Sequence, residues 1–251
     1  MDNVAFEFDS LPLITQIRLT NFTGEFGGRV CLNTSKITPQ QQKGPTCGLV
    51  ALSMCLEHFG VKISVDDILE RAKSMGFTKQ GEMYSVDYMS SLINEYLPNC
   101  SKAKEMPNAK EFTQSIGEGK HILVAYDCGP NFQPVYSKGN SAHWLLACGF
   151  VEKQESIGFI ETRESIADPS EIAIIGYQGK STFVYQPILS VSYLFLLSRN
   201  LNIFPFNEII ASNAQLFEAG SKRDPDEYII PNPADLSEIR NRVVEIGSNS
   251  C

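Results

Sequence analysis

Apolar residues recur at helical spacing through much of the chain between residues 46 and 116. The first such run lies between Thr46, which can serve as an N-cap, and Gly60, which can stop a helix. Its apolar face comprises Leu49, Leu52, Leu56 and Phe59. Capping signals and the same spacing predict further helices over 64–75 and 85–97, with a weaker pattern over 111–116.

The pattern changes after about residue 120. Short segments rich in Val, Ile, Tyr and Phe alternate with segments that carry Gly, Asn, Pro and Ser, which is typical of strands and their connections. Strands are predicted over 121–126, 143–150, 172–177, 182–186 and 190–197, and short helices near 207–212 and 236–244. Helices that precede strands, without alternation, indicate an α+β protein rather than βαβ units.

The length of 251 residues fits one large domain. We expect a single domain over 1–251 in which a mainly helical part (41–120) packs on a mainly β part (121–251) with an antiparallel sheet. Residues 1 to about 40 have an extended, loop-like pattern with glycine breakers.

Composition and charge argue against some classes of binding partner. The net charge of -8 argues against nucleic acid or an anionic membrane as the main partner. No stretch reaches the roughly 20 apolar residues that span a bilayer. The first residues include Asp2, Glu7 and Asp9 and do not form a basic leader, so a secretory signal is not expected. We expect a cytoplasmic protein that acts as a monomer.

The chain has seven cysteines at irregular spacing and no C-x-x-C pair. With no secretory signal, these cysteines are expected to be reduced thiols. The cysteines and the histidines show no ligand-pair spacing, so neither a metal nor another cofactor is expected.

Cys47 is the candidate nucleophile. It follows the Gly44-Pro45 turn and falls in the first turn of the predicted helix, where the helix dipole favours a thiolate. An ordinary buried cysteine is the alternative, and Cys55, further along the same helix, fits that description.

Residues next to Cys47 could assist it. Gly48 could leave space for a substrate backbone. Gln42 could donate a hydrogen bond to a developing oxyanion, and Gln41 is a rival for that role.

His143 is the candidate general base. His58 lies on the same helix as Cys47, 11 residues further on, and is therefore roughly 16 Å away. His121 follows a charged turn and is assigned to the surface. His143 follows a polar loop and opens an apolar strand, which would hold a base rigidly at the mouth of a cleft that Trp144 is expected to line.

A third group usually orients the imidazole. Gln178, at the end of the 172–177 strand, and Asp168 are the candidates, although each could be an ordinary turn residue.

These segments resemble the actin maturation protease family, papain-like cysteine peptidases related to bacteriocin-processing peptidases. The strings that carry the resemblance are QKGPTCGLVAL (42–52), QGEMYSVDYM (80–89), LVAYD (123–127), SAHWLLACG (141–149) and QGKS (178–181). The resemblance implies a papain-like fold with Cys47 as nucleophile, His143 as base, and Gln42 and Gln178 in support. The hydrophobic segment 191–206 has no clear counterpart.

Members of this family remove the N-acetylated first residue, acetyl-Cys or acetyl-Met, from immature actin and expose an acidic N-terminus. Actin is therefore the implied protein substrate. An acidic substrate and a protein of net charge -8 repel each other, so a basic spot beside the cleft is expected, with Lys43 and Lys138 as candidates. The alternatives are a papain-like acyl or peptidyl transferase, a catalytically inactive actin-binding module, and a broad deamidase or ubiquitin-type hydrolase.

Overall fold

The fold was examined in a computed structural model, which describes residues 29–130, 132–154, 168–180, 183–188, 191–196, 202–220, 226–232 and 235–247. The predicted N-terminal segment therefore lies largely outside the described residues. No helix in these ranges is long and apolar enough to cross a membrane. Within the same ranges, no group of three or more His, Cys, Asp or Glu side chains could hold a metal ion.

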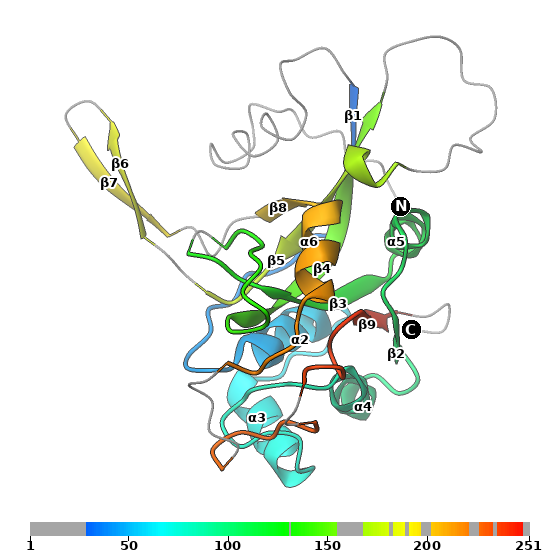
Figure 1. The fold of residues 1–251 in the computed structure, drawn as a ribbon, viewed down its shortest axis with the longest axis vertical. Helices are drawn as coiled ribbons and strands as arrows, with labels where there is room; N and C mark the ends of the chain where they lie inside the picture. Colours follow the sequence, from blue (N-terminus) through cyan, green and yellow to red (C-terminus); the bar gives the residue numbers. More distant parts are fainter. Residues whose placement is uncertain are drawn as a thin grey trace.

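The helices follow the sequence prediction closely (Figure 1). They are α2 (Cys47–His58), α3 (Val65–Ser74), α4 (Val86–Tyr96), α5 (Ala109–Gly117) and α6 (Phe206–Ala214), with a short 3-10 turn, η2 (Pro169–Glu171). The capping prediction is confirmed at two starts, where the side chains of Ser64 and Ser85 accept hydrogen bonds from the backbone of Asp67 and Tyr88.

The strands form an antiparallel sheet in the order β2-β9-β3-β4-β5-β8, with β1 pairing to the far half of β4. Their bounds are β1 (Arg29–Thr34), β2 (Ser101–Glu105), β3 (His121–Asp127), β4 (Ala142–Gln154), β5 (Ile172–Tyr177), β8 (Asn202–Pro205) and β9 (Arg242–Ile246). A separate two-stranded sheet pairs β6 (Phe183–Ile188) with β7 (Val191–Leu196) and projects away from the main sheet in Figure 1. The predicted α+β class with an antiparallel sheet is confirmed.

The predicted helix over 236–244 is wrong. Leu236 and Ile239 are buried at helix-like spacing, but they belong to a turn that ends at Asn241 with φ of 55°. The chain then enters β9, where Val243 and Val244 are buried on opposite faces of the sheet. Strand β2 was missed because its sequence, SKAKE, is half exposed and offers no apolar alternation.

Helices cover both faces of the main sheet. Alternate residues of β3 and β4, such as Leu123 and Leu146, join the core formed with α2, α3 and α4. Their neighbours, such as Val124 and Leu145, join the core formed with α5 and α6. The two cores hold the sheet between helical layers, and α2 thereby lies directly against β4 (Figure 1).

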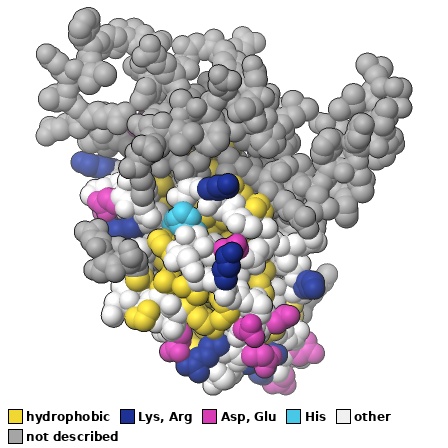
Figure 2. Space-filling model, turned by 180° about the vertical axis from the view of Figure 1, so that it is seen from behind, with side chains coloured by type: hydrophobic (Ala, Val, Ile, Leu, Met, Phe, Trp, Pro, Cys, Tyr) yellow, Lys and Arg dark blue, Asp and Glu magenta, His cyan; other side chains and the backbone are white. Residues whose placement is uncertain are grey.

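On the face shown in Figure 2, acidic side chains gather at the lower end of the described part.

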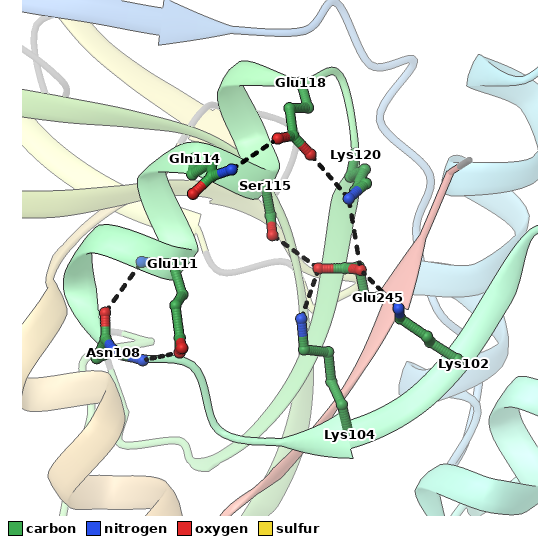
Figure 3. Close-up of polar contacts among 9 residues, drawn as sticks. All are labelled: Lys102, Lys104, Asn108, Glu111, Gln114, Ser115, Glu118, Lys120 and Glu245. Carbon is green, nitrogen blue, oxygen red and sulfur yellow. Dashed lines mark hydrogen bonds and ion pairs between the residues drawn. The ribbon is translucent and has the colours of Figure 1, made fainter. Parts of the chain in front are cut away.

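Glu245 on β9 joins several elements (Figure 3). Its side chain is 3% exposed, and it accepts bonds from Lys104 Nζ at 2.8 Å and Ser115 Oγ at 2.7 Å. Lys120 Nζ lies 3.7 Å away and also pairs with Glu118. These bonds connect β9 to β2, to α5 and to the start of β3, so the carboxylate fixes one end of the sheet.

The cysteines do not all match the expectation of reduced thiols. Cys47, Cys55, Cys128 and Cys148 are free thiols. Cys100 is disulfide-bonded, so the expectation is wrong for that residue. Because none of the four free thiols is its partner, the disulfide does not involve the candidate nucleophile.

Candidate active site

The nucleophile candidate lies at the first residue of α2. Gly44 has φ of 66°, a left-handed conformation that favours glycine and turns the chain before the helix. Thr46 occupies the N-cap position, but its hydroxyl donates to the Lys43 carbonyl at 2.8 Å and makes no capping bond. The first turn of α2 also contains no acidic residue. The positive end of the helix dipole is therefore not offset by a carboxylate or a side-chain cap, which favours an anionic sulfur at Cys47.

Cys47 and His143 line the same cavity, although 95 residues lie between them in the sequence. The cavity has a volume of about 340 Å³. The QGEMYS segment contributes Glu82, Met83 and Tyr84 to its wall. A sulfur from a helix start and an imidazole from a strand start thus line one cavity.

Gln178 holds the His143 ring. Its Oε1 atom lies 2.9 Å from His143 Nε2, and both residues are buried. The amide orientation is set by the backbone of Lys180, whose N–H donates to Gln178 Oε1 and whose carbonyl accepts from Gln178 Nε2. Because an amide oxygen can only accept, His143 Nε2 carries the proton, and Nδ1 is left with the lone pair that a base needs. Asp168, the other candidate, is exposed and accepts bonds from Ser170 in an ordinary turn.

Gly179 brings this strand end to the nucleophile helix. The Gln42 N–H donates to the Gly179 carbonyl at 2.7 Å. A Cβ at Gly179 would lie 2.9 Å from Gln42 Cβ and 3.0 Å from Val50 Cγ1, so only glycine fits there. Close packing of this turn on α2 places Gln178 within reach of the imidazole.

Gln42 lines the cavity, whereas its rival Gln41 is exposed and does not. Gln42 Nε2 donates to the Gly44 carbonyl at 3.0 Å. Its Oε1 atom is buried without a hydrogen-bond partner among the described residues. Since the amide nitrogen carries two hydrogens, the bond to Gly44 leaves one of them unused.

Gly48 and Trp144 serve the packing beneath the cavity. A Cβ at Gly48 would lie 2.8 Å from Met89 Cε and 3.0 Å from Trp144 Cδ1, so the space at Gly48 is filled by core side chains and offers no room to a substrate backbone. Trp144 does line the cavity, as expected, and its indole donates to the Met83 carbonyl at 2.9 Å. Gly48 is therefore required by the core and does not line the cavity.

The two lysines expected beside the cleft are exposed and do not line the cavity. Lys43 is held only through its backbone carbonyl, and Lys138 has a left-handed backbone with φ of 60°. Lys180 lines the cavity instead. Sequence reasoning missed it, although it lies in the QGKS string beside Gln178.

Burial is the main cause that lowers the pKa of His143 to about 3, and the nearby Lys180 lowers it further, while the bond to Gln178 acts in the opposite direction. The free site therefore holds a neutral imidazole at physiological pH, which is the form that accepts a proton.

The other histidines do not reach the site. His58 lies at the end of α2, with Nδ1 3.2 Å from the Lys36 carbonyl. The surface assignment of His121 is wrong, because its side chain is fully buried against His58 and Phe59. Neither ring nitrogen of His121 has a hydrogen-bond partner in the described part of the chain, and burial, with His58 nearby, lowers its pKa to about 3.

Comparison with known proteins finds sequences that resemble this chain. Residues 37–151 match the family model described as "Actin maturation protease-like, C-terminal domain". The chain is 30% identical over 207 residues to the actin maturation protease of Mus musculus, covering 76% of this chain and 56% of that protein. It is 30% identical over 195 residues to the Drosophila melanogaster protein, covering 76% and 60%. The Xenopus tropicalis protein is 26% identical over 237 residues, covering 89% and 75%.

The chain is thus similar to proteins named actin maturation protease over 76% of its own length. It spans 56–60% of the length of the mouse and Drosophila relatives. Among solved structures, one named as a C39-like peptidase from Bacillus anthracis aligns with a TM-score of 0.43 at 9% identity, over 87% of this chain and 98% of that chain.

The QGEMYS segment, which the sequence links to the actin maturation protease family, has a defined role in the cavity wall. The buried carboxylate of Glu82 accepts bonds from the backbone N–H groups of Lys79, Gln80 and Ile229 at 2.8–2.9 Å. Burial alone would raise the pKa of Glu82, but these bonds outweigh it and hold the pKa below its ordinary value. Glu82 therefore ties this loop to the segment around Ile229 as an ionised carboxylate. The role of Glu82 was not predicted, although the residue lies within the QGEMYS motif.

Gly81 in the same segment packs against the start of α2. Its φ is 113°, and a Cβ there would lie 2.6 Å from Thr46 Cγ2. The loop can approach the nucleophile helix this closely only because residue 81 is glycine. The motif therefore shapes the cavity through backbone contacts as well as through its side chains.

Proposed function

We propose that this chain is a papain-like cysteine protease that removes the N-acetylated first residue, acetyl-Cys or acetyl-Met, from immature actin. The observation that carries the proposal is the buried His143–Gln178 pair, which faces the cavity that Cys47 also lines. The similarity to actin maturation proteases supports actin as the substrate. A cytoplasmic location, expected from the sequence, is part of this proposal.

The reaction would begin with transfer of the Cys47 thiol proton to Nδ1 of the neutral His143 ring. The sulfur then attacks the carbonyl carbon of the acetylated residue, and the carbonyl electron pair moves to oxygen. The remaining N–H of Gln42 and the positive end of the α2 dipole stabilise this oxyanion. When the tetrahedral intermediate collapses, the C–N bond breaks and His143 protonates the leaving amine, which is the new actin N-terminus.

The second half of the reaction would regenerate the enzyme. His143 removes a proton from a water molecule, whose oxygen attacks the thioester carbon. The C–S bond breaks, the acetylated amino acid leaves, and the proton returns from His143 to the sulfur. Through both halves Gln178 keeps the imidazole in one orientation, so the same nitrogen serves as base and acid.

The cavity suits a small blocked residue. Beyond the catalytic groups, its wall includes the apolar or aromatic side chains of Met83, Tyr84, Tyr228 and Ile239. These groups could contact the methyl of an acetyl cap and a cysteine or methionine side chain. A volume of about 340 Å³ lies at the lower end of the range for ligand pockets, which favours a single capped residue over a long peptide segment.

The test is mass spectrometry of acetylated actin N-terminal peptides incubated with the purified protein. We expect the loss of one acetyl-amino acid with the wild type and none with Cys47→Ala or His143→Ala. Cys55→Ala is the matched control, because Cys55 is a buried free thiol that does not line the Cys47–His143 cavity. Cleavage that persists in Cys47→Ala would contradict the proposal. Products in which the acyl group is joined to an added amine, rather than to water, would indicate a transferase instead.

A further inference from the structure

A second cavity of about 640 Å³ adjoins the first. The two share Gln42, Ser141 and Lys180 in their linings. The rest of the second cavity comes from Gly44 and from the segment between Cys128 and Ser137. A peptide bound across Cys47 can therefore occupy both spaces, with one end in each.

Lys180 carries the positive charge at this junction. It is the only Lys or Arg among the described residues that line either cavity. Its ammonium forms no ion pair with any residue in the part of the chain that the structure describes. Its charge adds to the lowering of the His143 pKa that burial causes, and it opposes the rise in the Cys128 pKa that burial causes, so its field reaches the base as well as the second cavity. A half-buried cation without a partner is suited to an anionic ligand.

The backbone of Lys180 has a fixed position relative to the His143 imidazole. Both hydrogen bonds between its backbone and Gln178 hold it beside the His143 ring. In the proposed reaction His143 delivers a proton to the leaving amine, so the chain that follows this amine leaves from the neighbourhood of the ring. Lys180 is therefore near the residues that follow the scissile bond.

The opposite charge lies in the first cavity. Glu82 is the only Asp or Glu among the described residues that line either space. Its backbone hydrogen bonds keep it ionised. An acidic peptide segment is repelled from the Glu82 side and attracted to the Lys180 side, so the two charges give the bound peptide a direction.

We propose that Lys180 is a specificity residue that binds the acidic residues after the scissile bond, which lie in the second cavity, while the acetylated residue occupies the first. This inference rests on the proposed function and adds to it the residue that selects the acidic side of the substrate. It replaces Lys43 and Lys138 as the basic spot that the net charge of -8 requires.

The experiment measures kcat/KM for two acetylated peptides that differ only after the scissile bond, one with Asp and Glu and one with Asn and Gln. We expect the wild type to prefer the acidic peptide about five- to tenfold, as one partly shielded ion pair would give. Lys180→Met should abolish this preference, Lys180→Arg should keep it, and Lys180→Glu should reverse it in favour of the peptide with Asn and Gln. Lys43→Met and Lys138→Met are matched controls and should leave the ratio unchanged.

The outcomes separate this inference from the proposed function. If the wild type cleaves neither peptide, the proposed function is contradicted. If the wild type and Lys180→Met cleave both peptides with the same ratio, only the role of Lys180 is overturned. If Lys180→Met is inactive, the role of Lys180 is tested by the salt dependence of the wild-type preference for the acidic peptide. A preference that does not shrink between about 0.05 and about 0.5 M salt would overturn the inference.

Discussion

The imidazole of His143 and the amide of Gln178 lie 2.9 Å apart, and the backbone of Lys180 fixes the direction of the amide. His143 lies on β4, and Gln178 directly follows the last residue of β5. These two strands pair side by side in the sheet. The tautomer of His143 therefore depends on a neutral side chain rather than on a carboxylate.

Replacing Gln178 should reduce activity without removing it. Gln178→Ala leaves the ring without its acceptor, so we expect kcat to fall by about 10- to 100-fold while KM changes little. Gln178→Glu tests the charge, because a carboxylate would stabilise the imidazolium and shift the acidic limb of the pH–rate profile upward. Steady-state kinetics over a range of pH measures both effects. An unchanged kcat in Gln178→Ala would show that the amide does not position the base.

Alkylation should distinguish Cys47 from the other free thiols. Burial raises the pKa of the Cys55 thiol far above its ordinary value, and burial also raises that of Cys128. Cys47 is partly exposed at the helix start and lines an open cavity. Brief treatment of the native protein with iodoacetamide, followed by peptide mass spectrometry, should modify Cys47 first. Preferential modification of Cys128 would contradict this assignment.

Acid should destabilise the protein through its buried histidines. The pKa of His121 is about 3 in the folded protein and near 6.5 in the unfolded chain, so the unfolded state binds more protons between these values. Stability is present above about pH 6.5 and is lost as pH falls toward 3, by up to about 1.4 kcal/mol per pH unit for each such group. Denaturant unfolding at pH 7.5 and 5.5 measures the effect.

His121→Leu is the variant that isolates this contribution. The ring nitrogens of His121 make no hydrogen bond to a described residue, so an apolar side chain of similar size removes the titration without leaving a bond unmade. We expect a smaller loss of stability between the two pH values than in the wild type. The same pH dependence in both proteins would show that His121 is not responsible.

Gly48→Ala should destabilise the core beneath the site. The added methyl would lie 2.8 Å from Met89 Cε and 3.0 Å from Trp144 Cδ1, which we expect to cost about 1–3 kcal/mol of unfolding free energy. Gly117→Ala is the matched control, because a Cβ there meets nothing within 4 Å. Equal stability of the two variants in thermal unfolding would contradict the packing role.

Glu245→Gln should lower stability by about 2 kcal/mol, since charge-assisted bonds to Lys104 and Ser115 are weakened. Glu118→Gln, which alters an exposed carboxylate of the same network, should have a much smaller effect. Chemical denaturation of both variants measures the difference. Similar losses in the two would mean that burial of Glu245 does not strengthen the network.

The sequence predicted those features that depend on local patterns. The helix that begins at Cys47 and the strand that begins near His143 follow from turn residues and apolar spacing. The prediction of a helix over 236–244 is wrong because Leu236 and Ile239 have helical spacing in the sequence, while tertiary packing turns the chain at Asn241. Periodicity alone does not detect such a turn.

Features that depend on distant contacts could not be predicted from the sequence. Lys43 and Lys138 flank the Cys and His motifs in the sequence, yet both are exposed, and Lys180 lines the cavity because its backbone is bonded to Gln178. Gly48 is adjacent to Cys47, yet its missing side chain makes room for Met89 and Trp144. His121 follows a charged turn, but packing against Phe59 and His58 buries it.

The place of β9 in the sheet has a consequence for biosynthesis. Residues 242–246 pair with β2 on one side and with β3 on the other, so they lie inside the sheet although translation supplies them after all its other strands. A nascent chain on the ribosome has β3 and β4 long before it has the strand that completes their layer. The sheet that carries His143 is therefore complete only once these residues have emerged, and we expect the proposed activity to appear only after that stage of synthesis.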